Sequence, residues 1–120
     1  MKDSFIYKKS LSFGVRCVHF YQHWKEKGIY VVSKQLLRSG TSIGANVRES
    51  RFAQSPADFV SKLSIALKEA EETQYWLELM YQSNIISNEE YHSMNKDVDE
   101  LISLMVSSIK TYKSNSTCKS

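Results

Sequence analysis

The sequence predicts an all-α protein: an antiparallel up-down-up-down four-helix bundle over residues 1–112, followed by a short polar tail at 113–120. Three observations predict this fold. The 120 residues include one proline and four glycines, apolar residues recur at helical spacings of three and four, and no stretch alternates apolar and polar residues as a strand does. Short connections between the helices require neighbours to run antiparallel.

The first two helices are delimited by local signals. Ser4 is placed to cap a first helix that runs to about Lys27, and Gly28 follows at the position of a helix C′ glycine. A second apolar-periodic segment runs from about Tyr30 to Ala53. We therefore expect a tight connection around Gly28.

The third and fourth helices have clear start signals. Ser55 and Pro56 supply the N-cap and the first residue of a third helix that reaches about Gln82. A capping box at 87–90 opens a fourth helix that ends near Tyr112. The second, third and fourth helices each carry a heptad seam. In the third helix it consists of Phe59, Leu63, Ala66, Ala70, Thr73, Leu77 and Met80. In the second helix it consists of Val32, Leu36, Ser39, Ile43, Asn46, Ser50 and Ala53.

The helices carry more apolar surface than one bundle core needs. The first helix has two stripes on nearly opposite sides, and the pattern leaves open which one faces the core. One stripe comprises Phe13, Cys17, Phe20 and Trp24, and the other comprises Tyr7, Leu11, Val15 and Val18. The third helix has a further set away from its seam, Ile65, Trp76 and Leu79. These second stripes predict self-association, and the alternative is a wide core with a few exposed aliphatic residues.

Composition and charge limit the possible functions. Residues 1–60 contain ten Lys/Arg and four Asp/Glu, and residues 61–120 contain six and nine, so a basic half precedes an acidic half. The net charge of +3 does not by itself predict nucleic-acid binding. Two cysteines cannot form a disulfide scaffold. Charged residues interrupt the first 30 positions, so we expect no signal peptide, no membrane span and a cytoplasmic location.

The second helix has an unusual run of small and polar residues. Such groups are buried only when they are hydrogen-bonded, so we expect a polar network between the second and third helices. Its predicted members are Arg38, Ser39, Ser42, Asn46 and Glu49, with Lys68, Glu69 and Glu72 as partners. The network is interpreted as a device that sets helix register; a ligand-binding or catalytic site is the alternative.

The same helix carries a family resemblance. The stretch LLRSGTSIGANVRE at 36–49, with ADF at 57–59 and KLSIALKEA at 62–70, resembles the small bacterial four helix bundle proteins, also called the 23S rRNA intervening-sequence (S23-like) family. Ser50 stands where the family often has glycine, and a proline-containing linker before the second helix is absent. The resemblance implies a homopentameric ring with no established enzymatic activity. A structural relative, the accessory protein of diversity-generating retroelements, binds nucleic acid, which is an analogy of fold alone.

Basic residues suggest a possible contact with RNA or DNA. In a ring, a weak basic patch would repeat about the axis and could follow phosphates. The candidates for this contact are Lys2, Lys8, Lys9, Arg16, Arg48 and Arg51. The alternative function is an oligomeric adaptor or scaffold that contacts only protein.

The sequence contains no recognisable catalytic or cofactor motif. His19 and His23 share a helix face, but no third metal ligand accompanies them and the glutamate of a zinc-protease motif is missing. Glu89 and His92 have the spacing of a di-iron ligand pair without the companion pair that such a site needs. We therefore expect a non-enzymatic protein with no cofactor, no metal and no small-molecule substrate.

Overall fold

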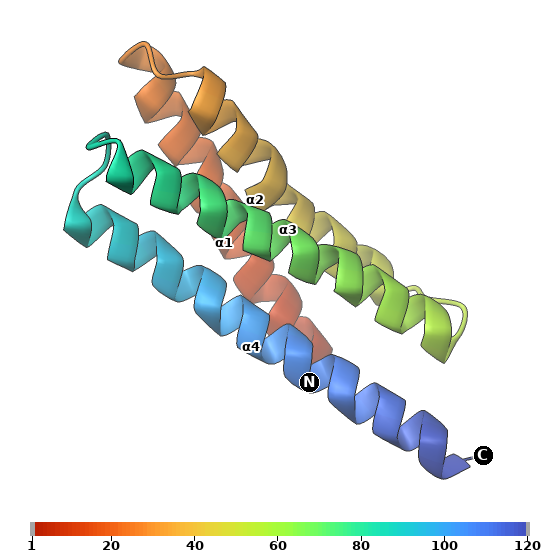
Figure 1. Cartoon of the computed structure of the whole chain (residues 1–120). Coiled ribbons are helices and arrows are strands. Elements are labelled where there is room, and N and C mark those ends of the chain that lie inside the picture. Colours follow the sequence, from red (N-terminus) through yellow and green to blue (C-terminus); the bar gives the residue numbers. More distant parts are fainter. Residues whose placement is uncertain (1, 120) are drawn as a thin grey trace.

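The computed structural model describes residues 2–119, and the side chains of residues 5–113. Four helices follow one another along the chain: α1 (Lys2–Glu26), α2 (Val31–Ser50), α3 (Pro56–Gln82) and α4 (Asn88–Lys119). They form an elongated bundle of 54 × 22 × 21 Å in which each helix runs antiparallel to the one before (Figure 1). No strand occurs within residues 2–119. The predicted all-α, up-down-up-down architecture is confirmed.

Three helix ends form where the local signals place them. Gly28 has φ +83°, and the amide of Ile29 donates to the Trp24 carbonyl at 2.9 Å, which closes α1. The Ser55 side chain accepts from the Asp58 amide at 3.0 Å at the start of α3. The Ser87 hydroxyl does the same for the Glu90 amide at the start of α4, also at 3.0 Å. The cap predicted at Ser4 is wrong, because α1 already begins at Lys2 and Ser4 lies within its first turn.

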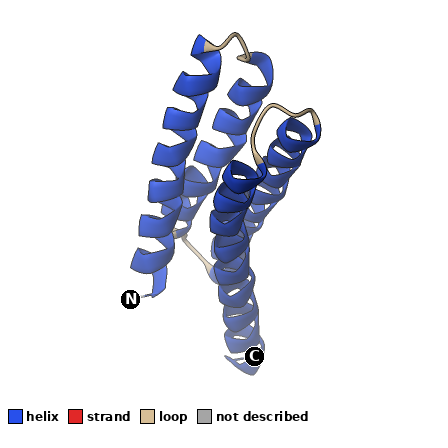
Figure 2. Ribbon diagram, turned by 90° about the vertical axis from the view of Figure 1, so that its left-hand side faces the viewer, coloured by secondary structure: helices blue, strands red, loops and turns tan. Residues whose placement is uncertain are grey.

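The predicted end of the fourth helix is wrong. α4 continues to Lys119 rather than ending near Tyr112. No glycine or proline follows Tyr112 to stop the helix, so backbone hydrogen bonding continues through the polar segment. α4 consequently projects past the N-terminus of α1 at one end of the bundle (Figures 1 and 2).

Burial decides which stripe of α1 faces the core. Phe13, Cys17 and Phe20 are buried together with Ile6, so the stripe containing them packs inward. The predicted seam of α3 is buried in full. The predicted seam of α2 is confirmed in part. Leu36, Ser39, Ile43 and Ser50 are buried as predicted. Val32, Asn46 and Ala53 are only half-buried, and Ser33, Gly40 and Val47 are buried instead.

Gly40 explains the close packing of α1 on α2. A Cβ atom at this position would lie less than 3.0 Å from Cys17 Sγ and 3.5 Å from Phe13 Cε2. The two helices can therefore approach this closely only where α2 has no side chain. α1 and α4 are the least closely packed neighbours, which leaves hollows between them.

Candidate interaction surfaces

Arg38 links α2 to α3 at the predicted polar network. Its guanidinium forms ion pairs with Glu69 Oε2, at 3.4 Å, and with Glu72 Oε2. The Trp76 indole Nε1–H donates to the same Glu72 oxygen at 2.9 Å. The Arg38 side chain is 49% exposed, so these ion pairs link α2 to α3 at the protein surface and do not form a buried site.

Beneath these ion pairs, two hydroxyl groups connect the same two helices. Ser39 Oγ and Thr73 Oγ1 lie 2.8 Å apart, and both residues are fully buried. Thr73 Oγ1 is also 2.8 Å from the Glu69 carbonyl oxygen. The sequence pattern places Thr73 in the apolar seam and does not reveal it as the partner of Ser39; the one available signal is its hydroxyl group within an otherwise apolar heptad.

The remaining members of the predicted network have other partners. Ser42 donates to the Arg38 carbonyl at 2.7 Å and Asn46 donates to the Ser42 carbonyl at 2.9 Å, so both bonds stay within α2. Glu49 pairs with Lys62 at 3.1 Å, and this hydrogen bond raises the pKa of Lys62. The expectation that Lys68 joins the network is wrong: Lys68 is exposed and has no polar partner among the described side chains.

Two of the predicted phosphate-binding residues are engaged within the chain. Arg16 Nη1 lies 2.7 Å from Asp97 Oδ2, and its Nη2 donates to Ser93 Oγ at 3.0 Å. Lys9 forms an ion pair with Glu100, and this hydrogen bond lowers the pKa of Glu100. Both residues therefore connect α1 to α4, and their charges are largely neutralised. The sequence alone does not predict the register of α1 against α4 that places Asp97 and Glu100 beside these two residues.

Arg48 and Arg51 lie on the opposite side of α1, around Tyr7. Arg48 Nη1 donates to the Tyr7 hydroxyl at 2.9 Å, and the Arg51 guanidinium stands 5.0 Å from the centre of the Tyr7 ring. Neither arginine forms an ion pair with a carboxylate among the side chains of residues 5–113. Lys8 is exposed, and the side chain of Lys2 lies outside the described residues.

The second stripe of α1 borders an apolar groove of about 320 Å³ between α1 and α2, which we call the α1–α2 groove. Leu11, Val15 and Val18 are 53%, 48% and 40% exposed, respectively. The α2 side of the groove is formed by Thr41, Gly44, Ala45 and Arg48. The sequence pattern predicts the α1 side of this groove but not the α2 side, for which the small residues of α2 are the available signal. Tyr7 closes one end and is half-buried.

The outer face of α3 carries the third predicted stripe. Ile65 is 42% exposed, whereas Trp76 and Leu79 are half-buried. Tyr75, which sequence analysis did not select, is 58% exposed and packs edge-on against Trp76. We call Ile65, Lys68, Tyr75 and Leu79 the α3 ridge.

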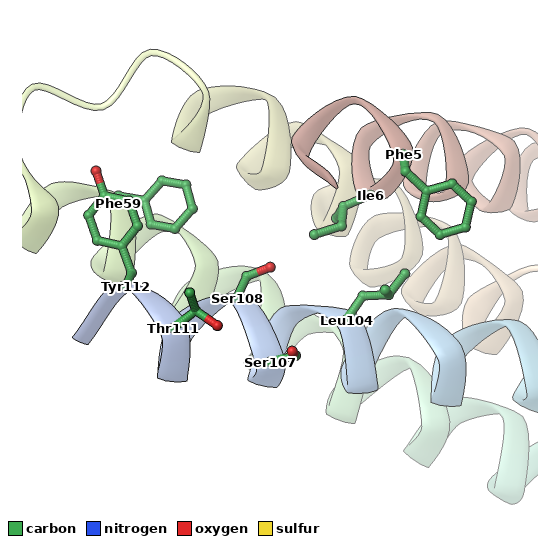
Figure 3. Close-up of a pocket in the computed structure, with 8 residues that line it drawn as sticks. All are labelled: Phe5, Ile6, Phe59, Leu104, Ser107, Ser108, Thr111 and Tyr112. Atoms are coloured by element: carbon green, nitrogen blue, oxygen red, sulfur yellow. The ribbon is translucent and has the colours of Figure 1, made fainter. Parts of the chain in front are cut away.

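A smaller hollow of about 210 Å³ lies between α1, the start of α3 and the C-terminal part of α4 (Figure 3). Phe5, Ile6, Phe59 and Leu104 give it an apolar lining, and the serine and threonine residues of α4 stand along one side. Phe59 stacks on Tyr112 at a ring separation of 4.2 Å. The hollow has hydroxyl groups but no charged or basic side chain, so its lining offers no acid–base chemistry.

Residues that could carry out chemistry are dispersed. The described residues contain no group of three His, Cys, Asp or Glu side chains able to hold a metal ion. Burial raises the pKa of the Cys17 thiol to about 12, which keeps it protonated and unreactive near neutral pH. Across the described part of the chain, every helix is too short or too polar to cross a membrane.

Comparison with known proteins places the chain in a family. No curated protein matches it. A crystal structure of a protein of unknown function from the S23 ribosomal protein family of Bacteroides thetaiotaomicron is 54% identical, covers 92% of this chain and 99% of its own, and superposes with a TM-score of 0.89. The sequence model of the 23S rRNA-intervening sequence proteins matches residues 2–107. The chain belongs to the 23S rRNA-intervening sequence protein family.

Proposed function

We propose that this protein is a non-enzymatic, homo-oligomeric four-helix bundle that associates with nucleic acid, and that its assembly is the pentameric ring implied by the family resemblance. The α1–α2 groove is the observation that carries the assembly. Leu11, Val15 and Val18 are aliphatic, adjacent and about half exposed. Because each side chain is already half covered, burying the rest contributes about 0.7–1.5 kcal/mol per side chain, half of the value for a fully exposed one. A contiguous apolar surface of this kind is typical of an interface.

The arginine pair beside Tyr7 supports the association with nucleic acid. The guanidinium groups of Arg48 and Arg51 are exposed and lack carboxylate partners among residues 5–113. A guanidinium fork matches a phosphate group in shape and charge. In a closed assembly the pair repeats once per copy, so several phosphates of one strand are contacted together and the affinity falls steeply with salt. Lys9 and Arg16 are not part of this proposed contact, because α4 carboxylates already neutralise them.

Filter binding of structured ribosomal RNA at increasing salt tests this function. The wild type should retain RNA at about 50 mM salt and release it as salt rises. The double variant Arg48→Glu/Arg51→Glu should lose retention while its mass by light scattering stays oligomeric. The matched control is Lys27→Glu/Lys34→Glu, which makes the same charge change at exposed positions at the other end of α2. Equal loss in both variants, or no retention by the wild type, contradicts the nucleic-acid assignment.

The ion pairs of Lys9 and Arg16 favour a second candidate, an oligomeric adaptor that contacts only protein. These ion pairs engage two of the four basic residues of α1 that are candidates for phosphate contact. The four residues are Lys2, Lys8, Lys9 and Arg16. An assembled wild type that retains no RNA at low salt supports this candidate over the first. A 13.9 kDa species in solution contradicts both.

A further inference from the structure

The α1–α2 groove and the α3 ridge are two different apolar surfaces on one chain. The groove is lined by α1 and α2, and the ridge is the outer face of α3. We propose that the groove of one copy receives the α3 ridge of the next copy, so that the subunits join head to tail. This inference rests on the proposed function, because it specifies which surfaces form the assembly.

The two surfaces are compatible in length and in shape. At 1.5 Å per helical residue, the groove extends about 16 Å from Tyr7 to Val18 and the ridge about 21 Å from Ile65 to Leu79, so the ridge spans the full length of the groove. The groove floor is hollow, since a Cβ atom at Gly14 would meet no other atom within 4 Å. Ile65 and Tyr75 are the exposed large apolar side chains of α3, at 42% and 58%. Projecting side chains of this size fit an open floor.

Charge favours this pairing over contact between two grooves. Arg48 lines the groove, is exposed and has no carboxylate partner among the side chains of residues 5–113. Glu71 and Glu78 flank the ridge, are exposed, and form no ion pair among the described side chains. Two grooves facing each other would bring two Arg48 guanidinium groups together. Groove and ridge instead bring Arg48 towards a surface where the exposed carboxylates of Glu71 and Glu78 outnumber the one ridge lysine, Lys68.

The use of two unlike surfaces determines the symmetry. A dimer with twofold symmetry buries the same patch on both copies, and groove-to-groove contact would leave the α3 ridge exposed. Contact between groove and ridge leaves a free groove at one end and a free ridge at the other. Further copies are then added until the assembly closes into a ring. Arg48 and Arg51 stand at the Tyr7 end of the groove and remain at its rim.

Mixing two assembly-defective variants tests the pairing. The groove variant is Leu11→Asp/Val15→Asp and the ridge variant is Ile65→Asp/Tyr75→Asp. All four positions are at least 42% exposed, so both variants should fold, which circular dichroism verifies. Each variant alone should be a 13.9 kDa monomer by native mass spectrometry. Val31→Asp is the control, because Val31 is 66% exposed and lies outside both surfaces; it should assemble like the wild type.

The mixture gives the decisive result. The groove variant retains an intact ridge and the ridge variant retains an intact groove, so an equimolar mixture should form 1:1 pairs of twice the chain mass and nothing larger. A ridge variant that still assembles, or a mixture that stays monomeric, overturns the inference while the oligomeric function stands. A monomeric wild type overturns both.

Discussion

Replacing Gly40 with alanine adds one methyl group at the closest approach of α1 and α2. The new Cβ atom would lie less than 3.0 Å from Sγ of Cys17, which is fully buried, so the sulfur or a helix must move. Alanine is better than glycine in a helix by about 1 kcal/mol, while overpacking a core costs about 1–3 kcal/mol. The steric cost exceeds the propensity gain, and we expect a net destabilisation of about 1 kcal/mol.

The background variant Cys17→Ala isolates the cause. Without the sulfur, the nearest atoms to the new methyl group are the Cβ at position 17, at 3.4 Å, and Phe13 Cε2, at 3.5 Å, which are ordinary contacts. Gly40→Ala should then stabilise the protein by about 1 kcal/mol, so the coupling between the two sites is about 2 kcal/mol.

Urea unfolding followed by far-UV circular dichroism measures all four proteins of this cycle. One protein concentration is used throughout, because the proposed assembly would make the apparent stability depend on concentration. The same effect of Gly40→Ala in both backgrounds would refute the steric explanation, and so would a stabilised single variant.

Three further predictions concern local interactions. Thr73→Val removes the bonded partner of the buried Ser39 hydroxyl and should lower the unfolding free energy by about 1–2 kcal/mol in urea, with partial recovery when Ser39→Ala is added. Ser55→Ala removes the acceptor of the Asp58 amide and should cost about 1 kcal/mol, whereas Ser55→Asp should retain most of the stability; equal losses would contradict the cap. Burial raises the pKa of Cys17 from 9.0 to about 12, so the folded state holds its proton longer than the unfolded state. Stability should be unaffected below pH 9 and fall between pH 9 and 12, and Cys17→Ala should remove this part of the pH dependence in alkaline unfolding titrations.

Most of the fold could be predicted because its signals are local. Gly28, Ser55 and Ser87 each act within one helical turn, and each performs its predicted role at a helix end. The end of α4 was missed because a helix with no stop signal continues past the last residue that packs on the core. The predicted seam of α2 is only partly correct because the burial of Gly40 beside Cys17 depends on the contact with α1, which the periodicity of α2 alone does not contain.

The candidate surfaces were predictable only in part. Exposure of the α1 stripe and the pairing of Arg38 with Glu69 and Glu72 agree with the sequence pattern. Spacing on one helix could not reveal that Arg48 would find Tyr7, since their contact joins residues 41 positions apart.

Residue order by itself determined the four helices and the presence of two apolar stripes on α1, because caps, turns and helical periodicity act over a few residues. Only the tertiary structure decided which stripe is buried and which charges remain free. The ion pair of Arg16 and Asp97 joins positions 81 residues apart, so it depends on the register of α1 against α4. That register follows from the packing of the whole core. It pairs Arg16 with Asp97 of α4, whereas Arg48 and Arg51 remain exposed at the surface.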